Sequence, residues 1–155
     1  MNTTPVHIAV FDTLADWEIG YATAHIRRDQ WQREPGRYSI NTVGPTREPV
    51  TTMGGLRIMP DIALDELRPE DSAMLILAGG DLWAEESMAG FRAAARRFLA
   101  AGVPVAAICG ATFGLALEGC LTIARTRATP PNTSRTADTP AATGSSPSPW
   151  WSTGT

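Results

Sequence analysis

The sequence predicts one α/β domain built on a mainly parallel β-sheet. Short apolar, partly β-branched runs are typical of buried strands, and segments with apolar residues at helical spacing lie between them. Glycine-rich turns follow directly after some of these runs. A chain of 155 residues is long enough for one domain with a substantial core.

Composition excludes several classes of partner. The net charge is −3 and no basic stripe is present, so nucleic acid is not an expected partner. No apolar run approaches the roughly 20 residues of a membrane span, and the N-terminus lacks the pattern of a signal peptide. Cys109 and Cys120 lie too far apart along a predicted helix to form a disulfide. We expect a soluble, cytoplasmic protein that does not bind membranes.

In the first half of the chain, strands are expected on either side of one helix. Residues 6–11 and 38–43 predict strands, and Asp16 is expected to cap a helix that runs to about Asp29. Residues 50–59 predict two short extended pieces that form a hairpin around Met53-Gly54-Gly55. His7, inside the first strand, is expected to be a histidine of a strand end or core edge rather than a ligand.

The second half continues the alternation. Residues 74–78 and 105–108 predict buried strands, and residues 87–101 predict an amphipathic helix between them. On that helix, Met88, Phe91, Ala95, Phe98 and Leu99 are expected to point inward and Arg92, Arg96 and Arg97 into solvent. A further helix is expected from Thr112 onward.

Cys109 lies at the expected turn between the strand at residues 105–108 and the next helix. The free amides and the positive end of that helix favour a thiolate over a thiol, which makes a cysteine nucleophilic. A buried structural cysteine is the alternative, since free cysteine is among the most buried residue types.

Two further features follow predicted strands and are therefore expected at the same edge of the sheet. Glu18 falls in the first turn of the first helix, where spacing alone favours a solvated carboxylate. Gly79 and Gly80 let backbone amides approach an anion closely, although Gly-Gly equally indicates an ordinary turn.

Several motifs, taken in order, resemble the DJ-1/PfpI superfamily of class I glutamine amidotransferase-like proteins. They are Phe11-Asp12 with Asp16-Trp17-Glu18, Gly54-Gly55-Leu56 with Pro60-Asp61, Leu77-Ala78-Gly79-Gly80-Asp81, and Ala107-Ile108-Cys109-Gly110-Ala111. The resemblance implies a flavodoxin-like fold with helices on both faces of the sheet. It also implies a homodimer that acts on a small molecule without a metal or cofactor.

The resemblance further implies residue roles. Cys109 is the nucleophile, and Glu18 reaches its sulfur and shuttles protons. The amides of Gly79, Gly80 and Gly110 form the oxyanion or substrate-binding site.

The chain departs from the proteolytic members, which carry a histidine directly after the cysteine. Gly110 stands there, and the two histidines, His7 and His25, lie near the N-terminus. An imidazole is wanted to protonate an amine leaving group, so protease and amidase chemistry is disfavoured. The favoured function adds water to a small carbonyl or nitrile-like substrate, in the manner of a glyoxalase or an isonitrile hydratase.

Other functions remain open. The chain can be a non-enzymatic stress sensor in which peroxide oxidises the Cys109 thiol. The domain can be the ligand-sensing module of a regulator, and a glutamine amidotransferase-like or protease-like hydrolase is a further alternative.

After Ile123 the chain has no Leu, Ile, Val, Met or Phe, and Thr, Ser, Pro, Ala and Arg dominate. Such a segment cannot bury enough apolar surface to offset its chain entropy. We therefore expect a domain at residues 1–125, with the last part of the fold missing or replaced, and a low-complexity tail at residues 126–155. An authentic tail and a frameshift both fit this change, and Cys120 at the boundary is assigned no role.

Overall fold

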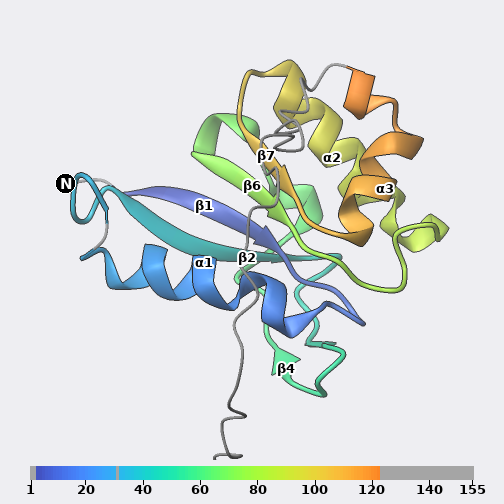
Figure 1. The fold of residues 1–155 in the computed structure, drawn as a ribbon, viewed down its shortest axis with the longest axis horizontal. Coiled ribbons are helices and arrows are strands. Elements are labelled where there is room, and N and C mark those ends of the chain that lie inside the picture. Colours follow the sequence, from blue (N-terminus) through green and yellow to red (C-terminus); the bar gives the residue numbers. More distant parts are fainter. Residues whose placement is uncertain (1–2, 31, 123–155) are drawn as a thin grey trace, which may run out of the picture.

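A five-stranded parallel sheet lies at the centre of the computed structural model, which describes residues 3–30 and 32–122. Its strands are β1 (Thr4–Ala9), β2 (Tyr38–Gly44), β5 (Ile62–Ala63), β6 (Met74–Leu77) and β7 (Val105–Ala107). They are ordered β5-β2-β1-β6-β7, and every neighbouring pair is parallel (Figure 1). The predicted parallel sheet is confirmed.

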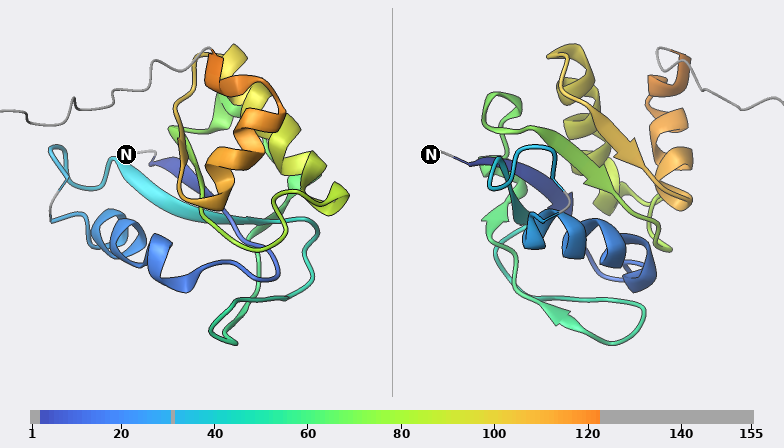
Figure 2. Two further views of the ribbon diagram at one scale, coloured as in Figure 1. Left: turned by 45° about the vertical axis from the view of Figure 1, so that its right-hand side comes forward. Right: turned by 60° about the vertical axis from the view of Figure 1, so that its left-hand side comes forward.

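Helices cover both faces of this sheet (Figure 2). They are α1 (Asp16–Arg28) on one face, and α2 (Ala89–Ala100) and α3 (Gly110–Leu117) on the other. Strand β6 shows why both faces are apolar. Ile76 belongs to the core cluster on the α1 side, whereas Leu75 and Leu77 belong to the cluster that includes α2 and α3. Successive side chains of a strand point to opposite faces, so a continuous apolar run fits a doubly covered sheet. The flavodoxin-like α/β fold is confirmed.

A small antiparallel hairpin extends from the sheet. It consists of β3 (Val50–Thr51) and β4 (Arg57–Ile58), as the sequence predicts. The hairpin is tied to the loop between β1 and α1, because the Thr13 amide donates to the Thr51 carbonyl oxygen at 2.9 Å and the Met53 amide donates to Leu14 at 3.0 Å. Short 3₁₀ turns complete the fold: η1 (Leu64–Glu66), η2 (Pro69–Asp71), η3 (Glu86–Met88) and η4 (Cys120–Thr122).

Asp16 does not cap α1, and that prediction is wrong. The capping position is Ala15, which makes no side-chain hydrogen bond, and Asp16 is the first helical residue. Its Oδ2 accepts a 2.7 Å hydrogen bond from the Gly54 amide of the hairpin. Hydrogen bonds from the Thr52 hydroxyl and the Gly54 amide lower the pKa of Asp16. This carboxylate joins the start of α1 to the hairpin.

The predicted exposure of Arg92 is also wrong, because only 8% of this residue is exposed. Its Nη1 donates to the carbonyl oxygens of Trp83 at 3.1 Å and Glu85 at 2.8 Å, and its Nε lies 3.6 Å from Oε1 of Glu118. These partners lie outside α2, so the spacing within that helix cannot reveal them. Arg96 and Arg97 are exposed as predicted.

Both cysteines are free thiols, with Cys109 exposed and Cys120 buried. Within residues 3–30 and 32–122, no helix combines the length and apolarity needed to cross a membrane. The predicted tail at residues 126–155 and the domain boundary at residue 125 lie outside the described residues.

Candidate active site

Three segments with predicted site residues leave the carboxyl ends of neighbouring strands. Glu18 follows β1, Gly79 and Gly80 follow β6, and Cys109 follows β7. The strand order reverses between β1 and β6, since β2 and β5 lie on one side of this pair and β7 on the other. Open parallel sheets bind their ligands at such a reversal, outside the carboxyl ends of the strands.

Cys109 has an unusual backbone conformation at the start of α3, with φ 50° and ψ −121°. L-residues rarely adopt a positive φ, and such strain costs on the order of 1–3 kcal/mol unless the surroundings impose it. Here the Ile108 amide is held by the Leu77 carbonyl at 2.9 Å, and the Cys109 carbonyl accepts the Thr112 amide at 3.0 Å and the Thr112 hydroxyl at 2.6 Å. Because the residue is exposed, the alternative of a buried structural cysteine does not apply.

The side chain of Glu18 turns toward the sheet. Its Oε2 accepts a 2.6 Å hydrogen bond from the Gly79 amide. A Cβ atom placed on Gly79 would lie 3.0 Å from each carboxylate oxygen of Glu18 and 3.1 Å from Cβ of Cys109. The Glu18 carboxylate and Cβ of Cys109 therefore both lie close to one point beside Gly79. Glu18 is half-buried, so the expectation of a solvated carboxylate is wrong.

The three predicted glycines differ in what their amides do. The Gly79 amide is bonded to Glu18. In the described part of the chain, the amides of Gly80 and Gly110 donate no hydrogen bond. These two residues also pack closely, because a Cβ on Gly110 would lie 3.1 Å from the Gly80 carbonyl oxygen and 3.6 Å from its nitrogen. Two adjacent unpaired amides are the donors that an oxyanion requires.

Neither histidine lies beside Cys109. His7 is buried in β1 and bonded to Ser72, which precedes β6 at the amino end of the sheet. Burial lowers the pKa of His7, and Asp71 acts in the opposite direction. His25 is seven residues further along α1 than Glu18, which is about 10 Å along a helix axis.

Trp83 belongs to the site and was not singled out from the sequence. Its indole is buried and lies against Gly110 and Gly114 of α3. The available signal was the pair of glycines four residues apart, which leaves room for a large ring on one side of that helix.

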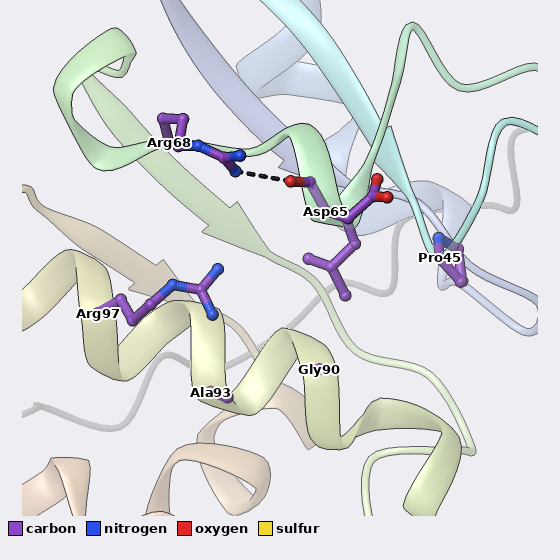
Figure 3. A pocket seen from close by; sticks show the side chains of 7 residues that line it. Pro45, Asp65, Arg68, Gly90, Ala93 and Arg97 are labelled. Atoms are coloured by element: carbon purple, nitrogen blue, oxygen red, sulfur yellow. Dashed lines mark hydrogen bonds between the residues drawn. The ribbon is translucent and has the colours of Figure 1, made fainter.

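Other features of the described residues do not contribute to this site. Within residues 3–30 and 32–122, no three His, Cys, Asp or Glu side chains are grouped to hold a metal ion. A cavity of about 440 Å³ lies elsewhere, between η1 and α2, and Arg68 and Arg97 line it (Figure 3). Neither Cys109 nor Glu18 borders that cavity.

Comparison with known proteins identifies relatives of this chain by sequence and by structure. The "Uncharacterized protease YoaZ" of Bacillus subtilis (strain 168) is 40% identical over 122 residues, which are 78% of this chain and 58% of that protein. A thiJ/pfpI family protein from Bacillus anthracis is 42% identical with a TM-score of 0.67, covering 78% of this chain and 57% of the other. The DJ-1 superfamily protein Atu0886 from Agrobacterium tumefaciens is 33% identical with a TM-score of 0.65, covering 77% and 60%.

The chain thus spans less than two thirds of the length of these relatives. The family model that describes the "DJ-1/PfpI family" matches residues 4–142. The match includes Glu18, Gly79 and Cys109. With these relatives and this fold, the chain belongs to the DJ-1/PfpI family.

Proposed function

We propose that this chain is a cysteine enzyme that adds water to a small carbonyl or nitrile-like substrate. Cys109 is the nucleophile, Glu18 shuttles protons, and the amides of Gly80 and Gly110 hold the developing oxyanion. The Gly79 amide holds the Glu18 carboxylate in place. The homodimer that the family resemblance implies and the cytoplasmic location expected from the sequence are part of the proposal. Light scattering tests the homodimer.

One observation carries this proposal: Glu18 and Cys109 meet at Gly79. The carboxylate oxygens and Cβ of Cys109 lie 3.0 Å and 3.1 Å from the position of a Gly79 Cβ. An acid and a nucleophile in such proximity can act on adjacent atoms of one bound molecule. The exposure of Cys109 leaves its sulfur accessible to a substrate.

For an α-ketoaldehyde the steps balance without an external oxidant. The thiolate of Cys109 adds to the aldehyde carbon, so a C–S bond forms and the carbonyl electron pair moves to oxygen, near Gly80 and Gly110. After this oxygen takes a proton from solvent, Glu18 removes the proton on the same carbon, and the electron pair moves through the new C–C double bond to the ketone oxygen, which takes the proton of the neighbouring hydroxyl. Glu18 then returns its proton to the former ketone carbon. The aldehyde carbon is thereby oxidised to a thioester and the ketone carbon reduced to an alcohol. Water cleaves the C–S bond and releases a 2-hydroxy acid and the thiolate.

A protease-like or amidotransferase-like hydrolase is a second candidate. The name of the Bacillus subtilis relative, "Uncharacterized protease YoaZ", favours it. Against it, these hydrolases use an imidazole to protonate the amine leaving group, and the two histidines of this chain, His7 and His25, both lie away from Cys109.

Turnover separates the candidates. The chain is incubated with methylglyoxal and, separately, with a fluorogenic peptide and glutamine. We expect lactate from methylglyoxal, with loss of this product in Cys109→Ser, and no cleavage of peptide or glutamine. Cys109-dependent peptide or glutamine hydrolysis without lactate would instead support the hydrolase. Oxidation of Cys109 by peroxide with no turnover of any of these substrates, or of an isonitrile, would support the thiol sensor.

A further inference from the structure

We propose that Trp83 is a positioning residue that clamps the Gly79-Gly80 turn to the segment carrying Cys109. Its indole donates to a backbone carbonyl, and it acts through the backbone on both sides of the site. The chemical use of the site rests on the proposed function, whereas the positioning itself rests on the contacts below.

The first contact joins Trp83 to the turn. Its Nε1 donates a 2.8 Å hydrogen bond to the carbonyl oxygen of Ala78, and the indole is 2% exposed. Ala78 directly precedes Gly79, whose amide holds Glu18. A buried carbonyl that lost this donor would be left unsatisfied, so the bond restrains the backbone that presents Glu18.

The second contact joins Trp83 to α3. A Cβ on Gly110 would lie 3.2 Å from Cδ1 of the indole, and a Cβ on Gly114 would lie 2.5 Å from Cε3. The ring therefore fills the space that these two glycines leave on one side of the helix. Any displacement of the ring changes the packing against Gly110, the residue that follows Cys109.

Trp83 is itself fixed from two directions. Its carbonyl oxygen accepts Nη1 of the buried Arg92 at 3.1 Å. Its ring packs edge-on against Phe11, with centroids 5.5 Å apart and planes at 81°. The Phe11 ring also packs against the Gly79-Gly80 turn, since a Cβ on Gly80 would be 2.5 Å from Cε2 of that ring. One packed unit thus connects Phe11, the turn and the start of α3.

The strained conformation of Cys109 explains why such support is needed. A residue at φ 50° keeps that conformation only when its surroundings impose it. Small displacements of reacting groups, on the order of 1 Å, can cost about 100-fold in rate. A clamp on both sides of the cysteine therefore has a direct effect on the reactivity of its sulfur.

The test measures alkylation of Cys109 by iodoacetamide against pH in the full chain, with peptide mapping by mass spectrometry. Trp83→Phe keeps an apolar ring but removes the indole donor, and Gly114→Ala places a methyl group 2.5 Å from Cε3 of the indole, so the ring must move. Trp17→Phe is the matched control, because Trp17 is 67% exposed. Alkylation of the buried Cys120 in the same samples reports general loosening of the fold.

We expect Trp83→Phe and Gly114→Ala each to slow alkylation of Cys109 about tenfold or more and to move its pH profile. Trp17→Phe should match the wild type, and Cys120 should stay protected throughout. A wild-type rate and profile in both site variants would overturn the inference, and so would a parallel rise in the labelling of both cysteines.

Turnover is kept as a separate readout. A chain that turns over none of the proposed substrates but shows the expected alkylation pattern would contradict the proposed function and support the clamp. Cys109-dependent turnover together with unchanged alkylation in both variants would support the proposed function and contradict the clamp.

Discussion

The Glu18 carboxylate accepts the Gly79 amide at 2.6 Å, across 61 positions of sequence. This bond ties the first turn of α1 to the end of β6. Because Cβ of Cys109 lies against the same glycine, the bond also determines where an acid stands relative to the thiol. The chemistry proposed for this chain depends on that contact, and the predictions below begin with it.

Replacing Glu18 by Gln keeps the shape of the side chain but removes its ability to exchange a proton. We expect lactate formation from methylglyoxal to fall by about 10²–10⁴-fold, the range of a lost general acid or base. Steady-state kinetics with wild type and Glu18→Gln checks this. An unchanged kcat would remove Glu18 from the mechanism while leaving the fold assignment intact.

Gly79→Ala places a methyl group against both reacting side chains. The added Cβ would meet the Glu18 oxygens at 3.0 Å and Cβ of Cys109 at 3.1 Å, so one of them must move. We expect turnover to fall about tenfold or more with the fold retained. Gly20→Ala is the control, since a Cβ there meets nothing within 4 Å. It should raise the free energy of unfolding by about 0.5–1 kcal/mol and leave turnover unchanged.

The two thiols are expected to differ in reactivity. Cys109 is exposed, whereas burial, reinforced by Glu118, raises the pKa of Cys120. Iodoacetamide near neutral pH should therefore label Cys109 first, and Cys120 only after denaturation. Peptide mapping over a time course decides this, and equal labelling of the two in the native chain would contradict it.

Asp16 should make the free energy of unfolding depend on pH in the acidic range. The Thr52 hydroxyl and the Gly54 amide hold its pKa below the usual 3.8. Between the lower pKa of Asp16 in the folded chain and its pKa of 3.8 in the unfolded chain, the unfolded chain binds more protons. The contribution of Asp16 to the free energy of unfolding is therefore complete above pH 3.8 and is lost as the pH falls through the pKa of the folded state. Denaturant unfolding between pH 2 and about pH 6 should show a smaller loss of stability toward acid in Asp16→Asn than in the wild type. Identical pH profiles would show that the hairpin contact does not favour the ionised form.

Removing Arg92 should destabilise the fold. Its guanidinium satisfies the carbonyl oxygens of Trp83 and Glu85, which Met cannot do. We expect Arg92→Met to lower the free energy of unfolding by about 2–3 kcal/mol. The control Arg97→Met changes an exposed side chain, and its effect should stay within about 0.5 kcal/mol. Equal effects of the two substitutions would show that the buried contacts of Arg92 do not contribute to the free energy of unfolding.

The sequence by itself determined the features that depend on local pattern. The apolar runs predict the strands β6 and β7, and Gly54-Gly55 marks the hairpin. The burial expected for residues 105–108 is met only in part, because the residues of β7 are half-buried. The place of Cys109 between a strand and a helix follows in the same way. Backbone preference and side-chain period act over a few residues, so these features can be recognised without knowing what packs against them.

Only the tertiary structure decided which way the polar side chains of these elements turn. Helical spacing is the same whether Glu18 faces water or the Gly79 amide, and whether Arg92 is solvated or bonded to the Trp83 carbonyl. Asp16, expected at a helix cap, is bonded to Gly54 instead. In each case the partner lies on another element or loop, and a polar group that becomes buried must find whatever partner the assembled fold brings within hydrogen-bond distance. Those partners are set by the order and packing of the strands, which local pattern does not contain.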